Sequence, residues 1–409
     1  MGENSKKIWI KAFALLTSAS CLAGVAFWSV ARAQNAPAGR TQGAPAAAAR
    51  AQSTDDVPVP RFKVDPSWPK QLPNNWLMKG VPRITVDRQD RVWIVTRGEE
   101  ITEAEAGADQ NPPTSLCCKK PPSVMAFDAQ GNVVYAWGSK ESLPGGLFNR
   151  RIRALILDGD GNVWIGGNDP GDTLLQFTPD GKFLRDFGHR GPAVPANQLK
   201  ANNQQTDYFV HSPANPTIDP EARELYLEDA APNRRILVYN LDTGAFKRGW
   251  GGHGTPLSEI DNGPILPFDL NGPPIKNFTP PIQCVKISRD GLVYVCNRGG
   301  DSIQVFTKQG KFLKEFFMHR MTAKGGTRIN DLAFSADPTQ KYMYVSDPTN
   351  GMISILRRDN GVVVGSVGHY GHMAGELQLV DGIAVDSKGN LYTGEVTPGE
   401  RIQKFVLQR

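Results

Sequence analysis

Short runs of alternating apolar and polar residues, separated by glycine-containing turns, recur along most of this 409-residue chain. The clearest stretch is PIQCVKISRDGLVYVCNRGGDSIQVFTKQGKFLKEFF, at 281–317, which predicts strands at Gln283–Ser288, Leu292–Cys296, Ser302–Thr307 and Lys311–Phe317. Runs rich in β-branched and aromatic residues, with such turns between them, are typical of an antiparallel meander. Because one four-stranded sheet cannot bury both of its faces alone, neighbouring units are expected.

The same pattern recurs in five other segments: Arg83–Trp137, Arg153–Phe187, Ala214–Trp250, Ile329–Val367 and, incompletely, Val380–Phe405. Each carries a strand, a turn with Asp and usually Gly, and a second strand with Trp or Tyr, as in LILDGDGNVWIGG and AVDSKGNLYTGE. The last repeat lacks a fourth strand, which Arg61–Val64 most simply supplies. The sequence therefore predicts an all-β fold over 59–409, a six-bladed β-propeller of four-stranded antiparallel blades closed by an N-terminal strand.

The blades resemble NHL repeats, because DGIAVDSKGNLYTGE followed by RIQKF, at 381–405, is close to the usual wording of that repeat. Residues 59–409 also resemble secreted bacterial NHL-repeat proteins that share the opening DPSWPKPLPNNW, here DPSWPKQLPNNW at 65–76, and a Cys-Cys insertion. The best understood relatives of that fold, to which the chain is distantly similar, are the peptide α-amidating lyases (peptidyl-hydroxyglycine lyases). Since such propellers include enzymes, scaffolds and binders, the resemblance implies the fold and leaves the function open.

The resemblance to the lyases can be tested at the positions where those enzymes carry their zinc ligands. The lyases hold zinc with histidines at the starts of first strands, and the corresponding residues here are Arg153, Gln283 and Asp381. None of the three is histidine. A histidine-based zinc site is therefore not matched, and zinc-dependent lyase chemistry is disfavoured.

The N-terminal residues predict export. Residues 1–33 combine early lysines, an apolar run and an Ala-x-Ala site, which together indicate a secretory signal peptide rather than a membrane span. The alternative, a lipid anchor on Cys21, lacks the aliphatic residue expected three positions earlier. Residues 34–58 are rich in Ala, Gln, Pro and Gly and predict a flexible tether. The expected location is periplasmic or extracellular.

Charge argues against one class of partner. Cleavage after residue 33 would remove four basic residues and one acidic residue, so the formal charge would fall from +5 to about +2. A nearly neutral mature protein is not expected to bind nucleic acid.

Four cysteines would remain after cleavage, in keeping with an oxidising compartment. Cys284 and Cys296 are equidistant from Asp290, so a simple hairpin places them opposite each other, as a disulfide or as two core thiols. Adjacent Cys117 and Cys118 can form a ring, pair elsewhere or stay reduced. For that pair a structural, redox-inert role is favoured over catalysis.

Loop lengths indicate which face of the propeller carries the functional site. The turns between first and second strands and between third and fourth strands are short, whereas the other connections include every long segment. Long loops on one side of a rigid scaffold are where binding or catalysis is usually built. First strands begin on this long-loop face, with Arg83, Arg153, Asn215, Gln283, Asp331 and Asp381 in blade order. Second strands end there, with Arg97, Asn168, Asp229, Asn297 and Arg298, Asp347 and Glu395.

These rims predict a funnel that is basic over the first two blades and acidic over the last two. The candidate ligand-binding residues are Arg83, Arg153, Gln283, Asp331, Asp381, Arg298 and Glu395. The alternative is that such side chains tie blades together.

We therefore expect a secreted propeller that binds a small polar or anionic ligand, or a partner protein, on the long-loop face. The alternative is a propeller hydrolase or lyase, either lactonase-like with calcium or amidating-lyase-like, that uses the Asp, Glu and Arg side chains of the funnel. The residues specify no cofactor, and calcium is the candidate under the enzyme alternative. A cluster of carboxylates would favour calcium, whereas an arginine-dominated funnel would favour ligand binding.

Overall fold

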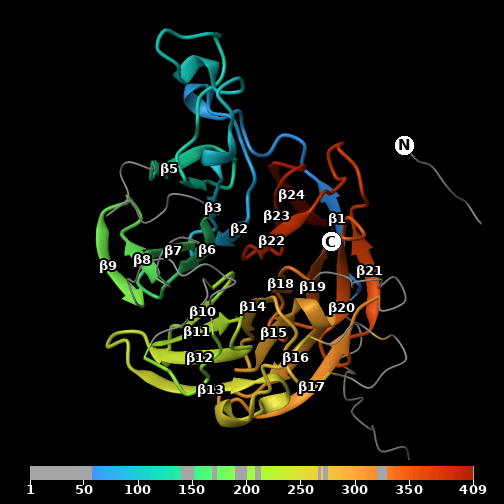
Figure 1. Ribbon diagram of the computed structural model, residues 1–409. Coiled ribbons are helices and arrows are strands. Elements are labelled where there is room, and N and C mark those ends of the chain that lie inside the picture. Colours follow the sequence, from blue (N-terminus) through green and yellow to red (C-terminus); the bar gives the residue numbers. More distant parts are fainter. Residues whose placement is uncertain are drawn as a thin grey trace, which may run out of the picture. The chain divides into compact units, whose positions relative to one another are not determined.

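The computed structural model describes residues 58–139, 152–167, 173–188, 200–207, 213–265, 269, 275–319 and 329–408. The expected signal peptide and nearly all of the expected tether lie outside these residues. Six four-stranded antiparallel sheets are arranged in a ring, which confirms the six-bladed propeller (Figure 1). No helix among the described residues is long and apolar enough to cross a bilayer.

Blades one to three follow one another along the chain, and each runs from an inner first strand to an outer fourth strand. Their strands are β2 (Arg83–Val86), β3 (Val92–Val95), β4 (Val124–Phe127) and β5 (Val133–Trp137); β6 (Ile152–Leu157), β7 (Val163–Gly167), β8 (Thr173–Phe177) and β9 (Phe183–Gly188); and β10 (Thr217–Asp219), β11 (Glu224–Asp229), β12 (Arg235–Asn240) and β13 (Phe246–Gly251).

Blades four and five repeat this order, and blade six combines both ends of the propeller. The strands are β14 (Ile282–Ile287), β15 (Val293–Asn297), β16 (Ser302–Phe306) and β17 (Phe312–Phe317); β18 (Leu332–Phe334), β19 (Tyr342–Asp347), β20 (Met352–Arg357) and β21 (Val363–Val367); and β22 (Val380–Val385), β23 (Leu391–Glu395), β24 (Arg401–Gln408) and β1 (Arg61–Val64). Short 3-10 helices occupy connections: η1 (Pro73–Asn75), η2 (Gly98–Glu100), η3 (Gly107–Asp109), η6 (Gly252–Gly254), η7 (Leu257–Glu259) and η8 (Arg298–Gly300).

The repeated Asp of the first turn explains why the sequence pattern recurs. In blade two, the Asp158 carboxylate accepts hydrogen bonds from the backbone N–H groups of Asp160 and Asn162, and from Trp164 Nε1 at 2.8 Å. Gly161 supplies the left-handed backbone of this turn, with φ of +85°. One carboxylate therefore closes the turn and also satisfies the buried indole N–H of the second strand.

The hydrophobic core lies between neighbouring blades. One cluster joins Trp93 and Val124 of blade one to Leu155 and Phe177 of blade two, and another joins Tyr344 of blade five to blade six. Sheets that pack face to face in this way each bury the face that a single blade would expose.

The strand Arg61–Val64 was expected to close the ring, and the structure confirms it. β1 pairs with β24, with Arg61 opposite Gln408 and Val64 opposite Phe405. Phe62 packs against Tyr344 of blade five, with ring centroids 5.4 Å apart. The first and last strands of the propeller are therefore held in one sheet.

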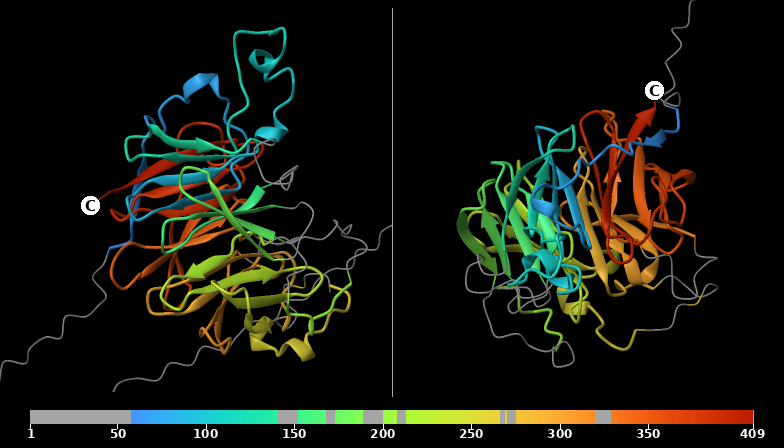
Figure 2. Two further views of the ribbon diagram at one scale, coloured as in Figure 1. Left: turned by 90° about the vertical axis from the view of Figure 1, so that its left-hand side faces the viewer. Right: turned by 90° about the horizontal axis from the view of Figure 1, so that it is seen from above.

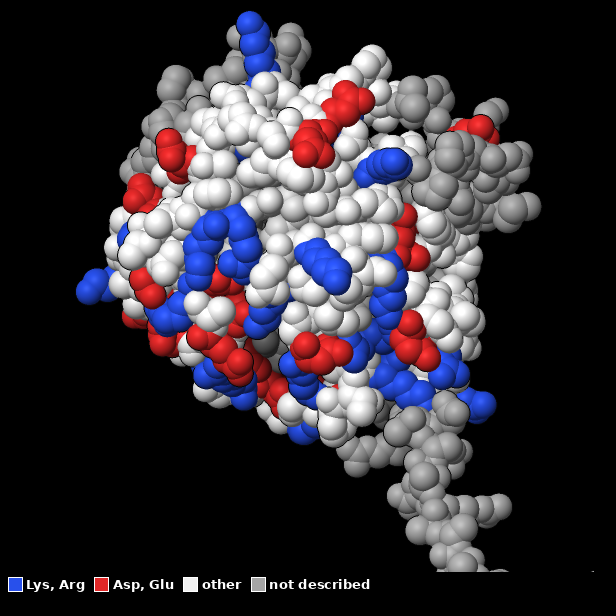
Figure 3. All heavy atoms as spheres, turned by 90° about the horizontal axis from the view of Figure 1, so that it is seen from below, with Lys and Arg blue, Asp and Glu red and all other residues white. Residues whose placement is uncertain are grey.

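One side of the propeller carries acidic and basic side chains next to one another, without a large patch of a single sign (Figure 3).

We predict that a chain beginning at residue 66, which lacks β1, will be less stable than a chain beginning at residue 58. The loss of the packing of Phe62 and Val64 and of the β1–β24 backbone pairing should cost roughly 2–4 kcal/mol. Thermal and urea unfolding of the two chains measures the difference. Equal stability would show that β1 does not close the ring.

Candidate functional site

The first strands of alternate blades are irregular at one residue each, close to the axis of the propeller. The pairing of β6 with β7 shifts between Ile152 and Ala154, and equivalent shifts flank Gln283 in β14 and Asp381 in β22. A β-bulge leaves its extra residue outside the ladder and re-aims the side chain, so Arg153, Gln283 and Asp381 are set apart from their strands. The pairings of β2, β10 and β18 run without a shift.

Arg83, which begins β2, is buried and bonded across the axis. Its Nε donates to the carbonyl oxygen of Ala214 in blade three at 2.7 Å. Its Nη1 donates to the carbonyl oxygen of Asp381 at 2.8 Å and lies 3.4 Å from the Asp381 carboxylate. Only 1% of Arg83 is exposed. Its guanidinium therefore joins blades one, three and six.

Asp331 and Asn215 form a second contact between blades that are not neighbours. Asn215 Nδ2 donates to Asp331 Oδ1 at 2.7 Å, and Lys286 Nζ lies 3.2 Å from the same oxygen. Asp331 Oδ2 accepts from the backbone N–H of Ile383 at 3.0 Å. We call Arg83, Asn215, Lys286 and Asp331 the axial plug, because together they connect blades across the axis.

Glu228 of β11 lies behind this plug. It is buried, and its Oε1 accepts from the backbone N–H groups of Ala214, at 2.6 Å, and Asn215. Its Oε2 has no hydrogen-bond partner among the described residues. Burial raises the pKa of Glu228, and the nearby Arg83 charge only partly offsets this effect.

Two arginines contact Gln283, and the charge of a third, Arg97, acts on one of them, Arg153; we call Arg97, Arg153 and Arg298 the arginine cluster. Gln283 Oε1 accepts from Arg153 Nη2 at 3.5 Å and from Arg298 Nη1 at 3.3 Å. Gln283 is 1% exposed, and its Nε2 has no hydrogen-bond partner among the described residues. The amide of Gln283 thus connects arginines from blades two and four.

The electrostatics of Arg153 reflect this crowding. The pKa of Arg153 is lowered to about 10, chiefly by burial; the Asp381 charge opposes this lowering, and the charges of Arg83, Arg97 and Arg298 add to it. Like charges held together in a partly desolvated space disfavour the protonated form. An anion placed among these side chains would relieve that repulsion.

The structure differs from the expected separation of a basic and an acidic side. Asp381 is in contact with Arg83, and Asp331 is in contact with Lys286. The basic side chains of the plug therefore balance the charges of these two carboxylates. Sequence order alone does not reveal these contacts, because the partners come from different blades.

Glu395, the remaining candidate residue, lies in a separate network. Its carboxylate accepts from Arg401 Nε at 3.0 Å, from Gln403 Nε2 at 2.7 Å and from the backbone N–H of Gln378 at 2.8 Å. Asp229 is held in the same way by Arg235, at 2.8 Å. Second-strand ends therefore close the following turn in these blades, while Asn168 lies outside the described residues.

Two members of this region, Lys286 and Glu228, were not among the candidates chosen from the sequence. A signal exists for both, since each is a charged residue that directly follows an apolar residue near the end of a strand, in VKI and YLED. A charge at such a position is rarely buried without a partner. It therefore marks a site of polar contact.

A pocket of about 320 Å³ opens at the other end, between the short turns of blades one to three. It is lined by Val86, Arg88, Leu157, Asp160 and Ile218, among others. Any binding experiment must therefore distinguish the short-turn face from the long-loop face.

No three His, Cys, Asp or Glu side chains come together as a metal site within the described ranges.

Comparison with known proteins finds a short match to one family model and distant matches to solved structures. A family model described as "Two component regulator propeller" matches residues 146–169, a short part of blade two. No curated protein matches the sequence. Among solved structures, a streptogramin B lyase is 14% identical with a TM-score of 0.48, covering 85% of this chain and 98% of that one.

Virginiamycin B lyase from Staphylococcus aureus is similar to the same extent. Its selenomethionine form is 13% identical with a TM-score of 0.44, covering 85% of this chain and 90% of that one. A catalytically inactive variant with quinupristin is 14% identical with a TM-score of 0.45, covering 85% and 89%.

The buried carboxyl behind the plug generates a prediction on pH dependence. Because the folded state raises the pKa of Glu228, this group stabilises the protein below its ordinary pKa, and that stabilisation is lost as pH rises through the raised value. Glu228→Gln keeps an acceptor for the N–H groups of Ala214 and Asn215 and carries no charge. We expect the variant to melt higher than the parent protein at pH 8, with the difference vanishing towards pH 4.

Glu224, on the same strand, is the matched control with the opposite sign. Contacts with Arg248, Lys247 and Tyr226 lower its pKa to about 2. Its stabilisation is present above its ordinary pKa and is lost as pH falls through the lowered value. Glu224→Gln should therefore cost up to about 3 kcal/mol at pH 7 and progressively less towards pH 2. The same pH trend in both variants would refute this assignment.

Proposed function

We propose that the protein binds a small molecule bearing a carboxylate or similar anionic group at the axis, on the long-loop face, with Arg153 as the anchor. The observation that carries this proposal is the bulge in each of three alternate first strands, which sets Arg153, Gln283 and Asp381 apart at the axis. Bulges often re-aim a side chain next to a functional site.

The balance of charge supports an anionic ligand. The charges of Arg97 and Arg298 act on Arg153, and the Asp381 carboxylate that opposes them is also in contact with Arg83. Arg97 also has a carboxylate nearby, since its Nη1 lies 3.6 Å from Glu100. A carboxylate on a ligand would meet Arg153 and Arg298 in the forked geometry that guanidinium groups favour.

Gln283 supports recognition of a second polar atom. Its Oε1 orients Arg153 and Arg298, while the N–H groups of its Nε2 would donate to an oxygen of the ligand. A buried donor without a partner costs free energy, and a ligand that supplies an acceptor would recover it. The ligand class that fits best therefore has a carboxylate with a further oxygen acceptor nearby.

The plug explains how the site keeps its shape. Arg83 is bonded to three blades, so it would hold Asp381 and the start of β2 in place while the arginine cluster meets the ligand. Rigid support behind a binding residue reduces the entropy lost on binding.

We further propose that the protein works outside the cytoplasm, as a secreted propeller of the NHL type. Two disulfides, Cys117–Cys118 and Cys284–Cys296, support an oxidising compartment.

We predict that Arg153→Ala will weaken binding of small carboxylates roughly tenfold to a hundredfold, the loss of a charge-assisted hydrogen bond. The same change should leave the melting temperature unchanged or raise it, because it removes a cation that is crowded by other arginines. Isothermal titration calorimetry with mono- and dicarboxylates, against their neutral amides, measures the first effect. Thermal unfolding measures the second.

Two arginines serve as controls. Arg83→Ala leaves the buried Asp381 carboxylate without the arginine that it contacts, and should lower the free energy of unfolding by about 3–5 kcal/mol. Arg88→Ala changes the pocket at the short-turn face and should leave carboxylate binding intact. Strong destabilisation by Arg153→Ala, or loss of binding in Arg88→Ala, would end the proposal at this site.

A further inference from the structure

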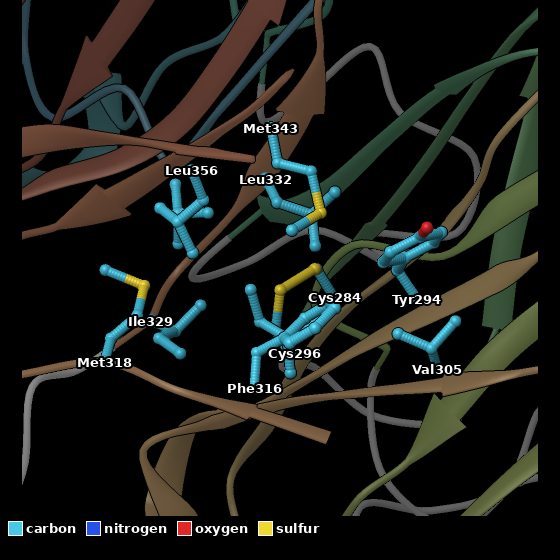
Figure 4. Packing of buried hydrophobic residues seen from close by; sticks show 12 residues of the cluster. Cys284, Tyr294, Cys296, Val305, Phe316, Met318, Ile329, Leu332, Met343 and Leu356 are labelled. Carbon is cyan, nitrogen blue, oxygen red and sulfur yellow. A yellow bond between two sulfur atoms is a disulfide. The ribbon is translucent and has the colours of Figure 1, made fainter. Parts of the chain in front are cut away.

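The two disulfides of the protein have opposite surroundings. Cys284 and Cys296 lie opposite each other on β14 and β15, as the hairpin geometry predicts, and both are fully buried. Met343, Leu332 and Phe316 belong to the same hydrophobic cluster (Figure 4). A dissolved thiol cannot reach these sulfur atoms while the blades remain packed.

Cys117 and Cys118 lie in the long segment between β3 and β4, which stands out from the blades (Figures 1 and 2). Cys117 is exposed, and the preceding Leu116 is 96% exposed. The two lysines that follow, Lys119 and Lys120, are exposed as well. Solvent therefore reaches this disulfide in the folded protein.

Backbone hydrogen bonds hold the chain on the C-terminal side of the Cys117–Cys118 disulfide. The Cys118 carbonyl oxygen accepts from the backbone N–H of Ala108 at 3.2 Å. The Lys119 backbone N–H donates to Asn75, at 2.9 Å, and its carbonyl oxygen accepts from Leu77, at 3.0 Å. Cys118 is therefore held within the segment by Ala108 and is followed by a residue bonded to the chain near η1, whereas Cys117 is exposed.

We propose that Cys117–Cys118 is a thiol-exchange site of the folded protein, open to small thiols or to the dithiol of a partner oxidoreductase. A thiolate attacks Cys117 Sγ, the S–S bond breaks, and the electron pair leaves on Cys118 Sγ, which takes up a proton. A second thiolate attacks the external sulfur of the mixed disulfide and releases Cys117 as a thiol. Two external thiols are oxidised to one disulfide, and the protein disulfide is reduced by two electrons.

Two features favour this direction of attack. Cys117 is the more exposed of the two residues, so it is the sulfur that an external thiolate reaches first. Cys118 is followed by Lys119 and Lys120, whose positive charges stabilise a leaving thiolate. The segment belongs to the long-loop face, yet the exchange chemistry does not depend on ligand binding at the axis.

The test uses the folded full-length protein with reduced glutathione or dithiothreitol. Samples are quenched with iodoacetamide at intervals, and peptide mass spectrometry measures the alkylation of each cysteine. We expect Cys117 and Cys118 to be alkylated at least about tenfold faster than Cys284 and Cys296. Oxidised glutathione should restore the Cys117–Cys118 bond, and a denaturant should abolish the difference between the pairs.

Single variants keep the outcome decisive. With oxidised glutathione, Cys118→Ser should form a mixed disulfide on Cys117 faster than Cys117→Ser forms one on Cys118. A thermal melt checks that both variants are folded. The proposal is overturned if the two native disulfides are reduced at equal rates, or if Cys117–Cys118 reacts only after the protein has unfolded.

Discussion

Six strand edges meet at the axis of the propeller, and the polar groups buried there must find hydrogen-bond partners. An unpaired charge in such a place costs several kcal/mol. Arg83, Asn215 and Asp331 meet this demand by bonding across the axis to blades that are not their neighbours. Closing the ring brings six first strands together at the axis. The hydrogen bonds and ion pairs of the axial plug allow polar side chains to be buried there.

The blades divide the axial positions between two roles. In blades one, three and five, residues at or just before the first strand, Arg83, Asn215 and Asp331, belong to the plug, to which blade four adds Lys286. In blades two, four and six a bulge sets one residue apart: Arg153, Gln283 and Asp381. Asp381 links the two sets through Arg83. Contacts that connect blades and bulged residues therefore come from the same region of the repeat.

The disulfides show a similar division between stability and reactivity. Cys284–Cys296 ties two neighbouring strands within the core of blades four and five, where packing shields it. Cys117–Cys118 lies in a segment that contributes to no hydrophobic cluster of the described residues. Burial, rather than bond type, decides which disulfide meets solvent.

Local pattern was sufficient for everything that depends on neighbours in sequence. The alternation of apolar residues predicted the blades, and the predicted strands of blade four differ from the observed ones by at most one residue at each end. The equal spacing of Cys284 and Cys296 from Asp290 predicted that they lie opposite each other on adjacent strands, because residues equidistant from a hairpin turn face each other. Arg61–Val64 was predicted as the missing strand because each blade needs four.

Only the tertiary structure decided what the candidate residues touch. Arg83 donates a hydrogen bond to Ala214, and Asn215 donates one to Asp331. These contacts join separate blades, so the spacing of residues along the sequence does not reveal them. The bulges that distinguish Arg153 from Arg83 depend on strand register, and Glu395 is drawn into a network with Arg401. Strand propensity and turn chemistry act over a few residues, whereas the partners of a buried charge depend on which blades the closed ring brings together at the axis.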